Sequence, residues 1–140
     1  MITKDIIAVL KNDTTIQTLL GAATAALCPV SAEYTFDDTV NKQINLSVEY
    51  GETIETDQSG KTHEGELRVY IMIKDSLSGP IALADSIASR VLALLDLKGT
   101  TLNATNTIYM IRKIDSDLTH YDAIHFYEQM LEFKFVETVA

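Results

Sequence analysis

The side chains able to do acid–base or metal chemistry gather in two polar stretches of the sequence. His63 lies beside Glu64 in the first stretch, and His120, Asp122 and His125 lie in the second. Imidazole nitrogens and carboxylate oxygens are common zinc ligands, so the second trio could in principle hold a metal ion. Zinc sites, however, usually show Cys/His pairs at short spacings or paired histidines on one helix, and the sequence has neither pattern. We therefore interpret these side chains as polar groups that stabilise turns.

The markers of other reaction classes are also absent from the sequence. Cys28 is the single cysteine, so no internal disulfide is possible, and we interpret it as a small buried hydrophobe. No Gly-x-Ser-x-Gly elbow occurs, and Gly60-Lys61-Thr62 lacks the preceding glycine of a phosphate-binding loop. We expect no catalytic residue, no cofactor and no metal. A small ligand-binding or hydrolytic domain that uses His120, Asp122 and His125 is kept as an alternative.

The length of the chain limits the number of domains, and its charge limits the kinds of partner. The 140 residues fit one domain, spanning 1–140. The net charge is −9, and residues 32–66 carry nine acids against two lysines, so this segment repels phosphate. Sequence-specific nucleic-acid binding is therefore disfavoured. No apolar run of about 18 residues and no signal-peptide layout is present, which predicts synthesis in the cytoplasm and no membrane partner.

Hydrophobic periodicity predicts two helical regions and four strands. The first helical region covers 3–20, with a possible interruption at Asn12-Asp13-Thr14 and a stop at Gly21; the second covers 78–95, capped by Ser78. The strands are expected at 44–50, 64–74, 108–114 and 125–136. Residues 51–63 are expected to form a long hairpin loop, and residues 115–123 a turn-rich loop.

This order, α-β-β-α-β-β, predicts an α+β domain with a mostly antiparallel four-stranded sheet and one long helix packed on it. The second face of that sheet is not wholly polar. Either the N-terminal helix or another subunit would cover it. The apolar residues assigned to this second face are Tyr70, Met72, Tyr109, Ile111, Phe126 and Met130.

The order of these patterns resembles the tail terminator family (tail-completion or head–tail joining proteins) of long-tailed bacteriophages. The opening stretch, residues 7–21, is similar to the family's start: a helix, a polar break, then apolar residues ending in glycine, with Pro29 before the first strand. Residues 65–74 look like its central strand, residues 81–95 like its long helix, and residues 127–135 like its closing strand. The likeness is one of pattern and order over nearly the whole chain, without a sharp motif.

The resemblance implies a structural protein of a phage or prophage virion, located at the junction of tail and head. Such proteins form a ring, typically a hexamer, that caps the tail tube protein, stops its polymerisation and receives the head–tail connector or stopper protein. DNA passes through the ring without sequence-specific binding. A related neck or tail-tube protein is the alternative. The residues expected at assembly contacts lie in the two polar stretches: Glu52, Glu55, Asp57, Lys61 and His63 in one, and Asp115, Asp117, His120 and Tyr121 in the other.

Overall fold

A computed structural model describes residues 2–32, 35–55, 61–98 and 107–139. The chain runs through α1 (Ile2–Asn12), α2 (Thr14–Leu20), the 3-10 helix η1 (Ala25–Leu27), β1 (Val30–Ser31), β2 (Lys42–Glu55), β3 (Lys61–Lys74), α3 (Pro80–Leu95), β4 (Thr107–Tyr121) and β5 (Phe126–Val139). The α+β class is confirmed.

The sheet has five strands in the order β1-β2-β3-β5-β4, so the expectation of four strands is wrong. The additional strand, β1, pairs parallel to β2 over two residues, Val30 with Ile44 and Ser31 with Asn45. The four long strands pair antiparallel, as expected. A two-residue strand beside Pro29 carries too little periodicity to be separated from an extended loop in the sequence.

Both polar stretches are mostly strand rather than loop. β2 continues to Glu55 and β3 begins at Lys61, with Thr53 opposite His63, so the expected long loop is largely a paired hairpin. β4 continues to Tyr121, past a bulge between Lys113 and Asp115. Backbone pairing with a neighbouring strand stabilises these polar segments, which is a tertiary effect that residue types alone do not reveal.

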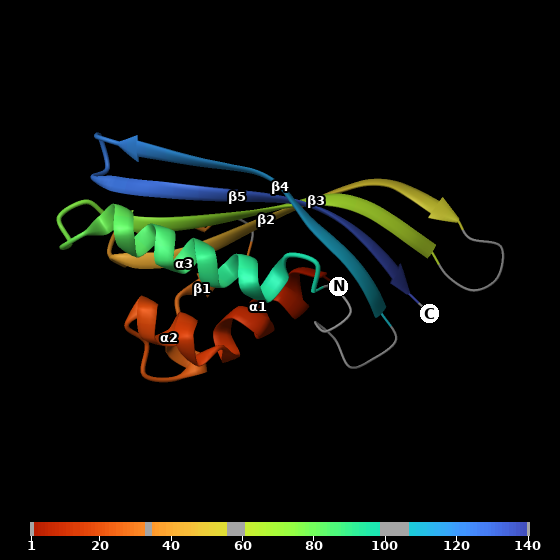
Figure 1. The fold of residues 1–140 in the computed structure, drawn as a ribbon, viewed down its shortest axis with the longest axis horizontal. Coiled ribbons are helices and arrows are strands. Elements are labelled where there is room, and N and C mark those ends of the chain that lie inside the picture. Colours follow the sequence, from red (N-terminus) through yellow and green to blue (C-terminus); the bar gives the residue numbers. More distant parts are fainter. Residues whose placement is uncertain (1, 33–34, 56–60, 99–106, 140) are drawn as a thin grey trace.

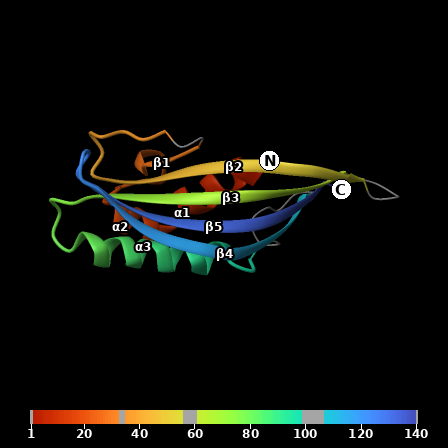
Figure 2. The same ribbon diagram turned by 90° about the horizontal axis from the view of Figure 1, so that it is seen from above.

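The helices α1, α2 and α3 lie on one face of the sheet (Figure 1). In the view from above, α1 and α2 lie behind the strands and α3 is seen beside β4 (Figure 2). The N-terminal helices therefore lie beside α3 and do not cover the second face. Their buried side chains, Ile2, Ile6, Leu10, Ile16 and Leu20, belong to the same core as the apolar face of the sheet. Ile111 also lies in this core, which corrects its assignment to the second face.

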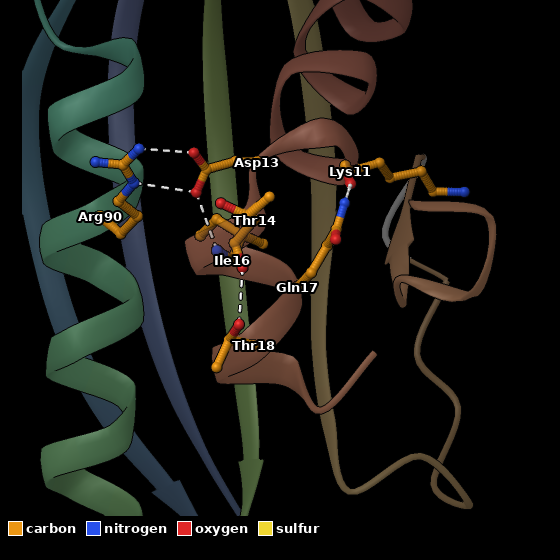
Figure 3. Close-up of polar contacts among 7 residues, drawn as sticks. All are labelled: Lys11, Asp13, Thr14, Ile16, Gln17, Thr18 and Arg90. Atoms are coloured by element: carbon orange, nitrogen blue, oxygen red, sulfur yellow. Dashed lines mark hydrogen bonds and ion pairs between the residues drawn. The ribbon is translucent and has the colours of Figure 1, made fainter. Parts of the chain in front are cut away.

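Asp13 links α2 to α3 (Figure 3). Its carboxylate accepts a hydrogen bond from the Ile16 backbone N–H at 2.9 Å and so caps α2. Arg90 of α3 donates to both carboxylate oxygens, at 3.0 and 2.6 Å. The guanidinium holds the pKa of Asp13 below its usual value, although partial burial opposes that shift.

Of the two predicted helix boundaries, the stop at Gly21 is confirmed and the cap at Ser78 is not. Gly21 ends α2 in the left-handed conformation, with φ of 72°. The predicted cap of the long helix at Ser78 is wrong, because Gly79 is the N-cap and no side chain bonds to the free amides there. Pro80 stands in the first turn, as its missing N–H favours.

One end of the helix-free face, called the open face below, is covered by the segment before β2. Phe36 packs edge-on against Phe126, with ring centroids 5.0 Å apart. The Gln43 side chain bonds to the backbone of Asp37 and Val40 and anchors this segment. Phe126 is consequently 1% exposed, and Met72 nearby in the sheet is 0% exposed. The second buried contact expected for this face is therefore made by a loop.

Candidate functional site

The two polar stretches lie at opposite ends of the sheet (Figure 1). The β2–β3 hairpin projects from one end, and the tight turn between β4 and β5 lies at the other end, beside the connection from β3 to α3. The candidate contact residues therefore form two separate groups. Each group can meet a different neighbour.

Five residues pack together at the β4–β5 turn, and we call them the tip cluster: Asp75, His120, Asp122, His125 and Tyr127. His120 places Nε2 at 3.0 Å from an Asp75 oxygen and Nδ1 at 2.9 Å from an Asp122 oxygen. Its ring lies 4.4 Å from the Tyr127 ring, tilted by 30°. The His125 Nδ1 lies 3.7 Å from Asp75. Both ring nitrogens of His120 are thus engaged by carboxylates.

The backbone also links this tip to the connection between β3 and α3. His125 adopts φ of 62° and accepts a hydrogen bond from the Asp75 N–H at 2.9 Å. Tyr121 donates to the Glu128 carboxylate at 3.3 Å, and that carboxylate raises the pKa of Tyr121. Among the described residues, no group of three or more His, Cys, Asp or Glu side chains is placed to hold a metal ion. The geometry at the tip thus corresponds to a hydrogen-bonded turn.

At the opposite end the structure describes fewer side chains. Asp57 lies outside the described residues, and for Glu52, Glu55 and Lys61 only the backbone course in β2 and β3 is described. His63 stacks edge-on with Tyr50, with ring centroids 6.0 Å apart.

Tyr50 forms a polar contact near the N-terminus of α1. Its hydroxyl donates to the Glu137 carboxylate at 3.1 Å, although Glu137 is almost fully buried. Burial and the Glu137 charge raise the pKa of Tyr50 to about 12, so the hydroxyl remains protonated and can donate near neutral pH. Contacts with Tyr50 therefore help to anchor the base of the β2–β3 hairpin.

The open face carries ordered rows of charge that the sequence reading did not single out. By register, Glu49, Glu66, Lys134 and Arg112 lie side by side across β2, β3, β5 and β4. The acids occupy the β2–β3 half of this row and the basic residues occupy the β5–β4 half. The next row contains Arg68, which lies 3.3 Å from Glu66 and 3.8 Å from Glu132. Alternation along each strand is the signal that could have placed these residues on one face.

Asp115 and Asp117 extend these rows on β4. Asp115 lies opposite Glu132, and Asp117 lies opposite Met130; both aspartates are exposed. They do not join His120 in the tip cluster, because their side chains alternate to the open face whereas that of His120 points to the helix face. The structure thus divides this group of predicted contact residues between two faces.

A groove of about 810 Å³ is lined by the first of these charged rows. Glu49, Glu64 and Glu66 come from β2 and β3, and Arg112 and Lys134 come from β4 and β5. Apolar lining is supplied by several side chains, including Leu97, Met110 and Val136. Met110 and Leu97 are 68% and 77% exposed. Such large exposed apolar side chains beside paired charges are typical of a protein-binding surface.

None of the helices within the described ranges has both the length and the apolar character that crossing a membrane requires.

Comparisons with known proteins identify the fold. No protein-family model matches the sequence. No curated protein matches it either. A chain of the virion of a native gene transfer agent particle superposes with a TM-score of 0.66, covering 95% of this chain and 91% of that chain, at 14% identity. A second solved structure, whose name states no activity, gives a TM-score of 0.59 at 13% identity, covering 96% and 94%. At these identities the likeness shows a shared fold over nearly the whole length.

Proposed function

We propose that this protein is a structural component of a phage-like virion. The observation that carries the proposal is the fold likeness to a virion chain, which spans nearly the full length of both chains. A fold by itself does not define a function, so the surface must also suit the role. Here the surface offers exposed apolar side chains, charged rows and two separate hairpin ends, which suit contacts with other proteins.

Within that class we propose the role of tail terminator. The protein would form a closed ring on the end of the tail tube, stop tube growth and present its other side to the head connector. Hairpins at opposite ends of one sheet support this proposal, because a terminator must contact two different neighbours at once. In this role no residue is catalytic, and neither a metal nor a cofactor is needed.

The charge of the chain suits a ring through which DNA passes. A net charge of −9 gives little attraction for phosphate, so DNA would slide rather than bind. The acids of the open face are balanced by Arg68, Arg112 and Lys134, whereas Asp115 and Asp117 leave β4 acidic near the tip. We expect no sequence-specific contact with DNA.

The proposal is tested by removing the gene from the strain that produces the particle and imaging the lysate. We expect filled heads and separate tails, with tails of irregular length, because neither tube capping nor joining occurs. Supplying the purified protein should restore joining. Normal particles in the absence of the gene would overturn the proposal, and complete loss of tails would instead indicate a tail-tube protein.

Two sets of variants test whether the two ends serve different neighbours. One variant lacks residues 53–61 of the β2–β3 hairpin, and the other carries Tyr121→Phe and Asp122→Asn at the β4–β5 turn. Tail length reports the contact with the tube, and the fraction of tails attached to heads reports the contact with the connector. We expect each variant to affect mainly one readout. Wild-type values of both readouts in both variants would contradict the assignment of contacts to these stretches.

A further inference from the structure

Along about half of β4, no strand within the described ranges pairs with its outer edge. The Ile111 carbonyl accepts from the Leu97 N–H at 2.9 Å, and the Lys113 N–H donates to the Asp96 carboxylate at 2.9 Å. These bonds show which residues direct their backbone away from β5. The register with β5 shows that, beyond the bulge, the backbone N–H and C=O groups of Ser116, Leu118 and His120 also point away from β5. No strand of the described chain pairs with these three residues on that side.

The opposite edge of the sheet, on β2, is also covered only in part. The Ile44 N–H donates to the Pro29 carbonyl, and β1 pairs with Ile44 and Asn45. Alternation directs the backbone groups of Leu46, Val48 and Tyr50 toward the same side, but the pairing of Ser31 with Asn45 engages the Leu46 N–H, so Val48 and Tyr50 are the positions beyond β1. Within the described ranges, the sheet ends there beyond the short β1. Within the described residues, β4 thus offers three consecutive outward positions and β2 offers two.

The directions of the two edges are compatible with pairing between copies. The sheet contains four long strands, each antiparallel to its neighbour, so β2 and β4 run in opposite directions. A second copy added in the same orientation therefore places its β2 antiparallel to β4 of the first copy. Repetition of this step is a head-to-tail association, which closes into a ring when the rotation between copies allows it.

We propose that the free part of β4 binds the free part of β2 of a second copy, forming a sheet continuous between subunits. This inference rests on the proposed ring and names the surface that builds it. The pairing that places the two free β2 positions opposite the first two outward positions of β4 sets Leu118 opposite Val48 of the partner copy, with Ser116 opposite Tyr50. Leu118 and Tyr50 are 41% and 39% exposed in the single chain, so the pairing removes apolar surface from water.

The same pairing has an unfavourable charge contact. On the open face it sets Asp117 opposite Glu49 of the partner copy, and like charges directly opposite each other weaken a strand pair. Subunit contacts between free molecules are then weak at low salt and strengthen as salt screens the charges. Asp117→Asn should consequently promote association. A mutation that merely damaged an interface would have the opposite effect.

Disulfide trapping tests the pairing directly. Val48→Cys and Leu118→Cys proteins are mixed at high concentration and oxidised, and the products are separated without reductant. We expect a disulfide-linked dimer only in the mixture, because residues opposite each other in a strand pair have Cα atoms within disulfide range. Cys28 is 3% exposed and is retained, with oxidised wild type as the blank. A mixture of Val48→Cys with Ser89→Cys, which lies on the exposed side of α3, is the matched control.

The outcomes separate this inference from the proposed function. A dimer formed by Leu118→Cys alone would overturn the proposal, because it indicates that β4 pairs with β4 of another copy. A closed ring seen by native mass spectrometry, without the Val48→Cys to Leu118→Cys linkage, would also overturn it and leave the ring proposal intact. The linkage found only in open chains, together with normal particles after gene removal, would support the edge pairing and reject the terminator role.

A proline variant gives a second test without cysteine chemistry. Leu118→Pro removes an N–H that faces the free edge, so the fold should persist, since edge strands tolerate proline at such positions. Leu118→Ala keeps that N–H and is the matched control. We expect at least a tenfold weaker self-association for Leu118→Pro than for Leu118→Ala at high salt. Equal association of the two variants, both folded by circular dichroism, would contradict the edge pairing.

Discussion

The two faces of the sheet differ in the side chains they carry and in what packs on them. The helix-covered face is a continuous apolar core in which Leu67, Val69, Ile71 and Phe133 are fully buried. The open face places charged rows and a groove on the same strands, and among the described residues those near Phe36 cover one end of it. The comparison teaches that one layer of helices supplies the stability of the fold. The other face is left available for contacts with neighbours.

The largest expected effect is a cavity in the helix-covered face. Phe133→Ala removes a fully buried ring, and we expect a loss of roughly 3–5 kcal/mol in the free energy of unfolding. Chemical denaturation monitored by circular dichroism measures the change. A loss below about 1 kcal/mol would mean that the helices do not pack on this face as described.

A second prediction concerns the close approach of three strands at Gly65. A Cβ atom there would lie 2.5 Å from the Phe135 ring and 2.6 Å from the Glu49 carbonyl oxygen. Gly65→Ala should therefore destabilise the protein by roughly 1–3 kcal/mol, because neither the ring nor the backbone can move freely. Gly51→Ala is the matched control, since its Cβ would meet only ordinary contact at 3.5 Å. Equal unfolding midpoints for the two variants would refute the close approach.

The link between the helices should have an intermediate effect. Asp13→Ala removes both the cap of α2 and the bond to Arg90, and we expect a loss of about 1–2 kcal/mol in thermal or chemical unfolding. Asp13→Asn retains a capping oxygen but loses the charge, so it should be less harmful. An Asn variant as unstable as the Ala variant would show that the ion pair, and not the cap, dominates.

Lowering the pH should remove the contribution of Asp13 to the free energy of unfolding. The pKa of Asp13 is lowered in the folded protein by Arg90, so its stabilisation is fully present above the unfolded pKa near 3.8. The contribution is lost as pH falls through the lower folded pKa. The difference in unfolding free energy between wild type and Asp13→Asn should therefore shrink below about pH 4. A difference that stays constant from pH 6 to pH 3 would exclude this linkage.

The smallest expected effect lies on the open face. Arg68→Ala breaks contacts with Glu66 and Glu132, but the Arg68 side chain is 36% exposed, and such surface pairs contribute about 0–1 kcal/mol. We expect the unfolding free energy to change little in chemical denaturation. A loss approaching that of Phe133→Ala would show that this face also carries the core stability.

The sequence pattern predicted the elements whose periodicity is strong. The stripe of α3 and the alternation of β3 and β5 were recognised because burial on one side repeats at 3.6 or 2 residues. The polar ends of β2 and β4 were taken for loops, since their residue types resemble turns and only the neighbouring strand reveals the pairing. The residues predicted to make assembly contacts were assigned to loops for the same reason. Only the register shows that Asp117 and His120 point to opposite faces.

Composition and periodicity by themselves determined an acidic α+β domain with one long amphipathic helix and antiparallel pairs of strands. These features follow from local spacing, which each segment carries in its own residues. The tertiary structure alone decided that α1, α2 and α3 share one face, and that β1 extends the sheet. It also decided which backbone groups of β2 and β4 point away from the sheet. These features depend on which distant segments bury each other's surface, and no local pattern records that choice.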